Sequence, residues 1–185
     1  MKSFDIDLYL WLEGYDDWMF VPAAGSNMAW PRMGVTQSEI LNGPAGVTFR
    51  IDGSLWLGDE RDRFPLSILV WVLHGSLSPV EPGELRMHIA NSEYRRTEVR
   101  QASSRDEVLV SRLSSRPVND DDYLEKTAQH VGTYYKDVAV PAELWCSAVN
   151  RTLDGLARAV ATSPPADLGE EKQLGDWLLG RLGRL

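Results

Sequence analysis

The side chains that could act as acid, base or nucleophile are scattered along this chain. The three histidines, His74, His88 and His130, fall in three separate predicted elements. No serine or cysteine stands in the setting of an activated nucleophile, and the sequence contains no glycine-rich phosphate loop or His-Glu-x-x-His zinc motif. We therefore predict that the protein is not an enzyme and holds no cofactor.

Two acidic runs have the residue types, but not the spacing, of a metal site. Residues 120–122 are three adjacent aspartates that point in different directions and lack the Asp-x-Asp-x-Asp-Gly pattern of a calcium loop. Asp59, Glu60 and Asp62 are interleaved with arginines, as in a solvated turn. The single cysteine, Cys146, excludes an internal disulfide. Its apolar neighbours predict a buried thiol.

Aromatic and acidic residues near the N-terminus are better placed to bind a partner. Residues 13–45 show no clear periodicity, and a connection of this length is usually functional or partly structured. It contains tryptophan and methionine, which are enriched at interface cores, although they could instead plug the end of the protein core. The predicted partner-binding residues are Trp11, Asp16, Asp17, Trp18, Trp30, Asp59, Glu60 and Asp62.

Strict alternation of apolar residues predicts a half-buried antiparallel strand over residues 4–12. Its second face carries Tyr9 and Trp11, which either lie under a helix or form an exposed aromatic pair. A short second strand is expected over residues 18–21 and one helical turn over residues 38–41.

The dipeptide Asp52-Gly53 predicts a type I′ hairpin, because both residue types tolerate the positive φ that this turn needs. A two-residue loop pairs Ile51 with Ser54, Arg50 with Leu55 and Phe49 with Trp56. Residues 66–77 follow, and their apolar spacing after Phe64-Pro65 favours a helix over a buried strand. This helix is apolar almost all round, so we expect other elements to cover most of its sides.

Alternation predicts three more strands, over residues 84–90, 93–100 and 106–113, as a meander that extends the first sheet. A helix from residue 119, a strand over residues 134–140 and a long amphipathic helix from Pro141 to residue 161 should follow. The meander carries four outward arginines, which either bind a partner or protect the sheet edge: Arg86, Arg96, Arg100 and Arg112.

These elements predict an α+β fold with an antiparallel sheet of about five to seven strands and two or three helices packed on one face. With 185 residues in the chain, one domain is the default. We place this domain at residues 1–162. Residues 163–185 form a C-terminal linker and helix that docks on the domain or on another chain.

Composition excludes several classes of protein. The net charge of −8 disfavours nucleic-acid binding and favours a basic partner, unless it serves solubility alone. The longest apolar run, residues 68–73, is too short to span a bilayer. Asp5 and Asp7 interrupt the N-terminal apolar segment, which is wrong for a signal peptide. We therefore expect a cytoplasmic protein without membrane contact.

The order of elements resembles a known class of protein. An alternating first strand, the hairpin FRIDGSLWLGD at residues 49–59 and the run RFPLSILVWVL at residues 63–73 are similar to small bacterial immunity proteins of polymorphic toxin and contact-dependent inhibition systems. The meander and the helix after PAELWC at residues 141–146 fit the same pattern. The resemblance implies a non-enzymatic toxin inhibitor, and it assigns no binding residues because it is architectural.

We predict that the protein binds a cognate bacterial toxin, a basic domain, and neutralises it by occlusion. The alternative is a ligand-binding or enzymatic α+β domain with a pocket between the sheet and residues 13–45. A third hypothesis is a homodimer that pairs through the C-terminal helix.

Overall fold

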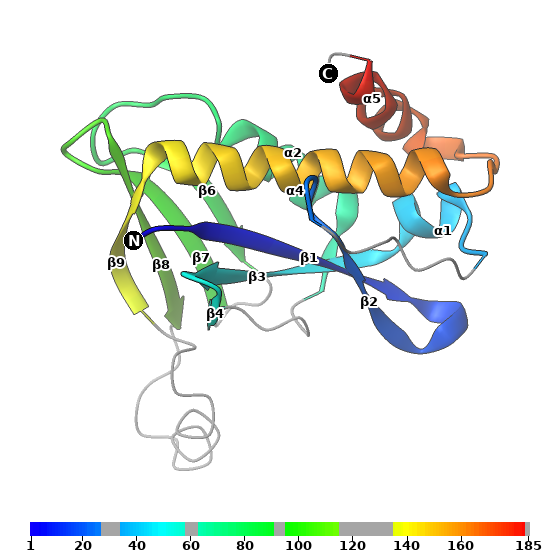
Figure 1. The fold of residues 1–185 in the computed structure, drawn as a ribbon, viewed down its shortest axis with the longest axis horizontal. Coiled ribbons are helices and arrows are strands. Elements are labelled where there is room, and N and C mark those ends of the chain that lie inside the picture. Colours follow the sequence, from blue (N-terminus) through cyan, green and yellow to red (C-terminus); the bar gives the residue numbers. More distant parts are fainter. Residues whose placement is uncertain (27–33, 58–62, 91–94, 115–134, 184–185) are drawn as a thin grey trace, which may run out of the picture.

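A computed structural model describes residues 1–26, 34–57, 63–90, 95–114 and 135–183 (Figure 1). The predicted helix from residue 119, the aspartates at 120–122 and His130 lie outside these residues. The elements, in chain order, are β1 (Phe4–Leu12), η1 (Glu13–Tyr15), β2 (Asp17–Val21), α1 (Gln37–Asn42), β3 (Pro44–Ile51), β4 (Ser54–Leu57), β5 (Phe64–Pro65), α2 (Leu66–Gly75), β6 (Leu85–Ala90), β7 (Arg95–Gln101), β8 (Glu107–Ser114), β9 (Tyr135–Pro141), α4 (Ala142–Thr162), η2 (Gly169–Glu171) and α5 (Lys172–Leu182).

The first sheet is antiparallel, with strand order β2-β1-β3-β4 and β5 also paired to β3. The type I′ turn between β3 and β4 is confirmed, because Asp52 and Gly53 have φ values of 49° and 79°. The predicted pairing of Phe49 with Trp56 is wrong. Phe49 pairs with Leu57 instead, because a β-bulge inserts one extra residue in β4.

The meander forms a second antiparallel sheet, with strand order β6-β7-β8-β9. The α+β class is confirmed, but the strands divide between two sheets and do not extend a single one. The physical reason is α2, which packs against both β3 and β6 and carries the chain from one sheet to the other.

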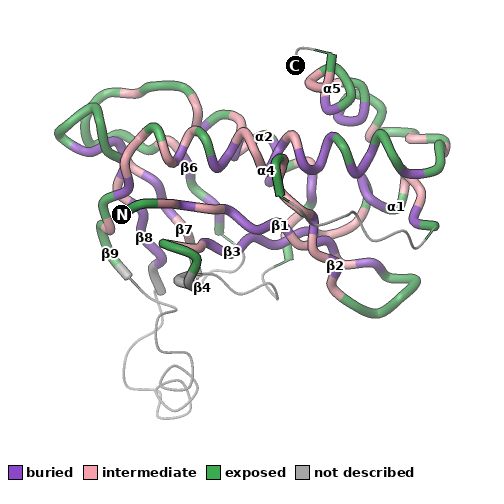
Figure 2. Tube along the Cα trace, in the orientation of Figure 1, coloured by how far each residue is buried: buried purple, intermediate pink, exposed green. Residues whose placement is uncertain are grey.

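The long helix α4 crosses both sheets and closes the core (Figure 1). Its fully buried Trp145 contacts the rings of Phe4 and Phe49, with centroids 5.6 and 6.1 Å away. The Trp145 indole N–H donates to the hydroxyl of buried Ser76, 3.1 Å away, so this polar group is satisfied inside the core. Figure 2 shows the buried positions on β1, β3 and α4.

The choice between helix and strand for the apolar run is settled in favour of the helix α2. It begins at Leu66, after Phe64 and Pro65 have paired with β3 as β5. The expectation that α2 is covered on most sides is wrong, because Ile68 and Trp71 are 53% and 38% exposed. The helix packs on its neighbours with one stripe and lies at the surface of the molecule.

The C-terminal helix α5 packs against α4 of the same chain. Leu174 and Leu178 are buried, and the guanidinium of Arg181 lies 2.6 Å from the Asp154 carboxylate in a largely covered ion pair. Homodimer formation through this helix stays a prediction.

Candidate functional site

Two aromatic pairs lie side by side on the face of the first sheet opposite α4. Tyr9 is directly opposite Phe20 and Trp11 directly opposite Trp18 in the β1–β2 register, so all four side chains share one face. Their ring centroids are 5.5 Å apart in each pair. We call these four residues the aromatic hairpin face. All four are half-buried.

A cation stacks on this face. The guanidinium carbon of Arg63 lies 3.9 Å from the centre of the Trp11 ring and 5.8 Å from that of Trp18. Such cation–π contacts contribute about 0.5 to 1 kcal/mol at exposed sites. Arg63 therefore helps to hold both tryptophans in place.

A fixed ion pair lies beside the aromatic residues. Arg50 of β3 donates a hydrogen bond to the carboxylate of Asp7 on β1. Asp7 is only 8% exposed. The hydrogen bond to Asp7 raises the pKa of Arg50 above its ordinary value. The pair leaves little net charge on this part of the sheet, so the charge of the hairpin comes from its turn.

The β1–β2 turn carries three exposed acidic residues, Glu13, Asp16 and Asp17. Asp16 adopts a left-handed conformation with φ of 50° at the end of η1, a conformation that Asp and Asn tolerate better than most residues. The Asp17 carboxylate accepts from the backbone N–H of Trp18 at 2.7 Å. The turn therefore presents concentrated negative charge next to the aromatic hairpin face.

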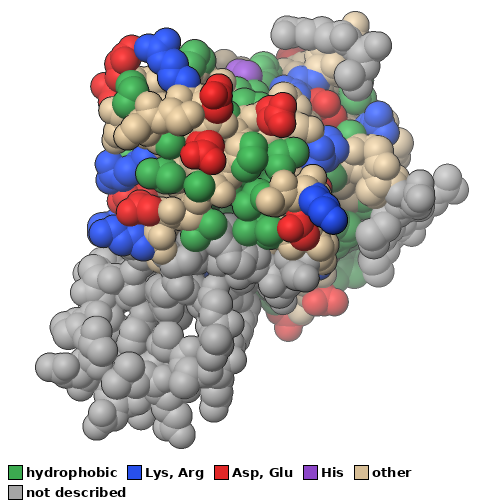
Figure 3. Space-filling model, turned by 60° about the vertical axis from the view of Figure 1, so that its left-hand side comes forward, with side chains coloured by type: hydrophobic (Ala, Val, Ile, Leu, Met, Phe, Trp, Pro, Cys, Tyr) green, Lys and Arg blue, Asp and Glu red, His purple; other side chains and the backbone are tan. Residues whose placement is uncertain are grey.

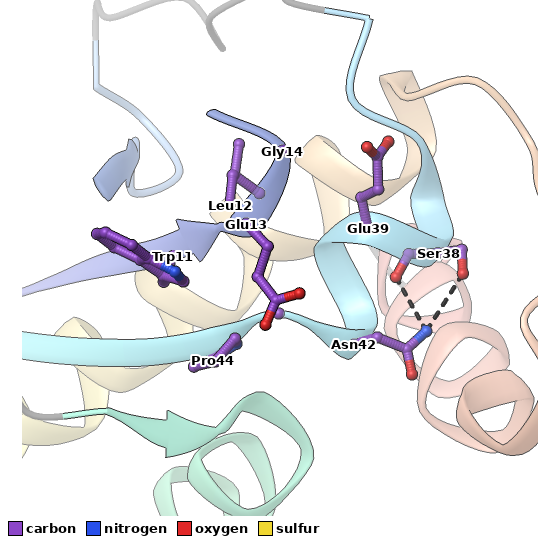
Figure 4. A pocket seen from close by; sticks show the side chains of 9 residues that line it. Trp11, Leu12, Glu13, Gly14, Ser38, Glu39, Asn42 and Pro44 are labelled. Carbon is purple, nitrogen blue, oxygen red and sulfur yellow. Dashed lines mark hydrogen bonds between the residues drawn. The ribbon is translucent and has the colours of Figure 1, made fainter. Parts of the chain in front are cut away.

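A cavity of about 280 Å³ lies between the end of β1 and α1. Residues 11–14 line one side, and Ser38, Glu39 and residues 42–44 line the other (Figure 4). We call it the Trp11 cavity. Gly43 lets α1 approach β1 this closely, because a Cβ there would lie 3.0 Å from the Trp11 and Glu39 carbonyl oxygens.

The polar groups of α1 in this cavity are largely engaged. Thr36 donates its N–H and hydroxyl to the Glu39 carboxylate, each at 2.8 Å, and this capping box lowers the pKa of Glu39. Asn42 donates its amide N–H groups to the carbonyl and hydroxyl oxygens of Ser38, at 3.0 and 3.2 Å. The Glu13 carboxylate makes no hydrogen bond or ion pair with the rest of the described chain.

The structure brings together four of the predicted partner-binding residues: Trp11, Asp16, Asp17 and Trp18. The others, Trp30, Asp59, Glu60 and Asp62, lie outside the described residues. Sequence reasoning did not assign Glu13 or Arg63 to the site. The acidity of residues 13–17 could have indicated Glu13, but Arg63 is distant in the chain and only folding places it on Trp11.

The predicted basic stripe of the meander does not form. Arg96 and Arg100 share a face, but both pair with the buried Glu98 at 2.8 Å. Arg112 is buried on the opposite face of the sheet, where it lies directly across from Thr97 of β7. Arg86 donates to Gln101. On the side of the molecule that Figure 3 shows, acidic and basic side chains are interspersed.

The remaining candidate groups for chemistry lie on separate elements of the fold. His74 is half-buried on α2, with its ring 4.9 Å from that of Trp177, and His88 is exposed on β6. Cys146 is half-buried, so the expectation of a buried thiol is only partly met. In the described part of the chain, no group of three or more His, Cys, Asp or Glu side chains is arranged to hold a metal ion.

Comparison with protein-family models, with curated proteins and with solved structures finds no match to this chain. The resemblance to immunity proteins therefore stays a prediction. Among the helices that the structure describes, none has both the length and the apolar character needed to cross a membrane.

Proposed function

We propose that this protein is an immunity protein that binds a bacterial toxin domain and neutralises it by occlusion, without catalysis. It acts in the cytoplasm, where its partner is a basic toxin domain. The observation that carries the proposal is the aromatic hairpin face with the acidic turn beside it. Tryptophan and tyrosine are enriched among binding hot spots in protein interfaces, and acidic groups next to them accelerate association with a basic partner.

The aromatic hairpin face is organised before binding. The cross-strand edge-to-face contact between Trp11 and Trp18, together with Arg63, holds both rings in place, so little side-chain entropy remains to be lost when a partner covers them. The acidic turn lies at the end of the same two strands. A partner that contacts one therefore meets the other.

The decisive first experiment is to identify the reading frame next to the gene and to express the encoded toxin domain. Co-expression of this chain should restore growth of cells that the toxin inhibits, and the purified proteins should form a stable complex. A chain that neither rescues growth nor binds a neighbouring toxin would refute the proposal.

A matched pair of tryptophan variants then tests the surface. Trp18→Ala removes an aromatic side chain from the aromatic hairpin face and should weaken toxin binding by about thirtyfold, the effect of a typical hot spot. Trp71→Ala makes the same change on α2, where the ring is 38% exposed. It should leave the affinity within about threefold of the wild type. Equal losses in the two variants would place the interface elsewhere.

The Trp11 cavity favours a second candidate function, a ligand-binding or enzymatic domain. The cavity lies between the first sheet and α1, where a pocket was predicted for this alternative. A thermal-shift screen with small metabolites tests it, and saturable stabilisation that is lost in Trp11→Ala would support it.

A further inference from the structure

The Trp11 cavity contains a carboxylate, that of Glu13, which has no hydrogen-bond or ion-pair partner among the residues that the structure describes. In Figure 4 the side chain of Glu13 points toward Pro44 and Asn42, and that of Glu39 points the other way. The Glu39 carboxylate is already engaged by Thr36. Since the Asn42 N–H groups are directed at Ser38, its amide oxygen is left as a second acceptor. The cavity therefore offers hydrogen-bond acceptors to a ligand that carries several donors.

The residues that line this cavity favour a cation. No Lys, Arg or His is among the described residues that line it, and Asp16 and Asp17 follow Glu13 closely in the turn. Trp11 forms one wall, and its ring already stacks with the guanidinium of Arg63 at 3.9 Å. A planar guanidinium matches both features, because it carries five N–H donors and stacks on aromatic rings, whereas an ammonium is a compact, strongly hydrated charge.

The size of the cavity favours a side chain over a free metabolite. Its volume of about 280 Å³ lies below the range of about 300 to 1,000 Å³ that is usual for small-molecule sites. The cavity also adjoins Trp11 of the aromatic hairpin face. A side chain that projects from a bound protein could therefore enter it.

We infer that the Trp11 cavity receives an arginine side chain of the partner protein, with the Glu13 carboxylate as its counter-ion and Trp11 as its wall. This inference rests on the proposed function and adds the chemistry of the contact. It makes Glu13, which the sequence did not single out, the residue that determines specificity at this position.

The inference can be tested with the full chain and a simple probe. Arginine amide is titrated into the ¹⁵N-labelled protein, and two-dimensional NMR spectra follow the backbone signal of Gly43 and the indole N–H of Trp11, assigned through its loss in Trp11→Phe. Citrulline amide is the matched control probe, because it has nearly the same shape without the positive charge. Saturable shifts are expected with arginine amide only.

Two glutamate variants provide the control on the protein side. Glu13→Gln should weaken arginine amide binding by at least about tenfold, because a charge-assisted hydrogen bond is lost. Glu143→Gln makes the same change at an exposed position near the start of α4, and it should leave binding unchanged. The inference is overturned if arginine amide gives no saturable shift, if citrulline amide binds equally well, or if both variants behave alike.

Binding of the toxin domain separates this inference from the proposed function. If the toxin binds the wild type and Glu13→Gln with equal affinity, the inference fails and the proposed function stands. If no toxin binds but arginine amide does so in a Glu13-dependent manner, the proposed function fails and the preference of the cavity for a guanidinium is supported.

Discussion

Gly155 lies where α4 packs closely against the chain that leaves β2. A Cβ atom on Gly155 would lie 3.0 Å from the Ala23 Cα and 3.1 Å from the Pro22 carbonyl carbon, and closer still to the Pro22 carbonyl oxygen. The backbone N–H of Ala24 donates to the carbonyl of Arg151 at 2.8 Å, so this segment is also hydrogen-bonded to α4. The contact anchors one end of the β1–β2 hairpin.

Two opposing effects decide what Gly155→Ala does. Alanine is favoured over glycine inside a helix by about 1 kcal/mol. Apolar heavy atoms pack at about 3.5 to 4.0 Å, however, so the added methyl group must displace backbone atoms. Overpacking of this kind costs about 1 to 3 kcal/mol, and backbone cannot move aside as a flexible side chain can. We therefore expect a cost near the upper end, about 3 kcal/mol, which exceeds the helix-propensity gain of about 1 kcal/mol. The free energy of unfolding should fall by about 2 kcal/mol.

Urea denaturation followed by circular dichroism measures this change, with Gly180→Ala as the matched control. Gly180 lies in α5 with nothing within 4 Å of its hypothetical Cβ. The control substitution should therefore raise stability by up to about 1 kcal/mol. At this chain length Gly155→Ala should lower the melting temperature by about 4 to 8 °C. A Gly155→Ala variant with an unchanged m-value and a midpoint at or above that of the wild type would refute the reasoning.

Three further predictions concern stability and assembly. Burial by itself would raise the pKa of Glu98, but its two arginine partners outweigh burial and lower this pKa below the ordinary value of 4.5. Because a lowered carboxylate pKa stabilises the fold above the unfolded-state pKa, Glu98→Gln should cost about 1 to 2 kcal/mol at pH 7. The difference from the wild type should shrink in denaturation curves below pH 4.5, and a constant difference down to pH 3 would contradict this. Ser76→Ala leaves the buried indole N–H of Trp145 without its acceptor and should cost about 1 to 3 kcal/mol, whereas Ser78→Ala, at an exposed position, should change stability by less than about 0.5 kcal/mol. Removal of residues 170–185 exposes apolar surface on α4 and should lower the melting temperature. Light scattering on the full and shortened chains also tests the homodimer, since a dimer that persists after the deletion would exclude pairing through α5.

The sequence by itself determined most of the secondary structure and part of the candidate site. Asp52-Gly53 specified its turn because only a few residue types adopt positive φ, and the alternation over residues 4–12 identified the face of β1 that carries Trp11. The acidic and aromatic character of residues 11–18 indicated a binding segment. These features depend on the residues themselves and on their immediate neighbours in the chain, so the sequence contains the information directly.

Only the tertiary structure decided which strands are neighbours and which side chains meet. A period of two residues shows which side chains share a face, but it does not name the adjacent strand, and one bulge is enough to change the partner of Phe49. Packing of α2 against both sheets divided the strands and left Trp71 exposed. The register of β7 and β8 placed Arg112 on the buried face of the second sheet. Folding also brought Arg63 onto Trp11 and α1 against β1, because contacts between distant segments follow from how the whole core packs.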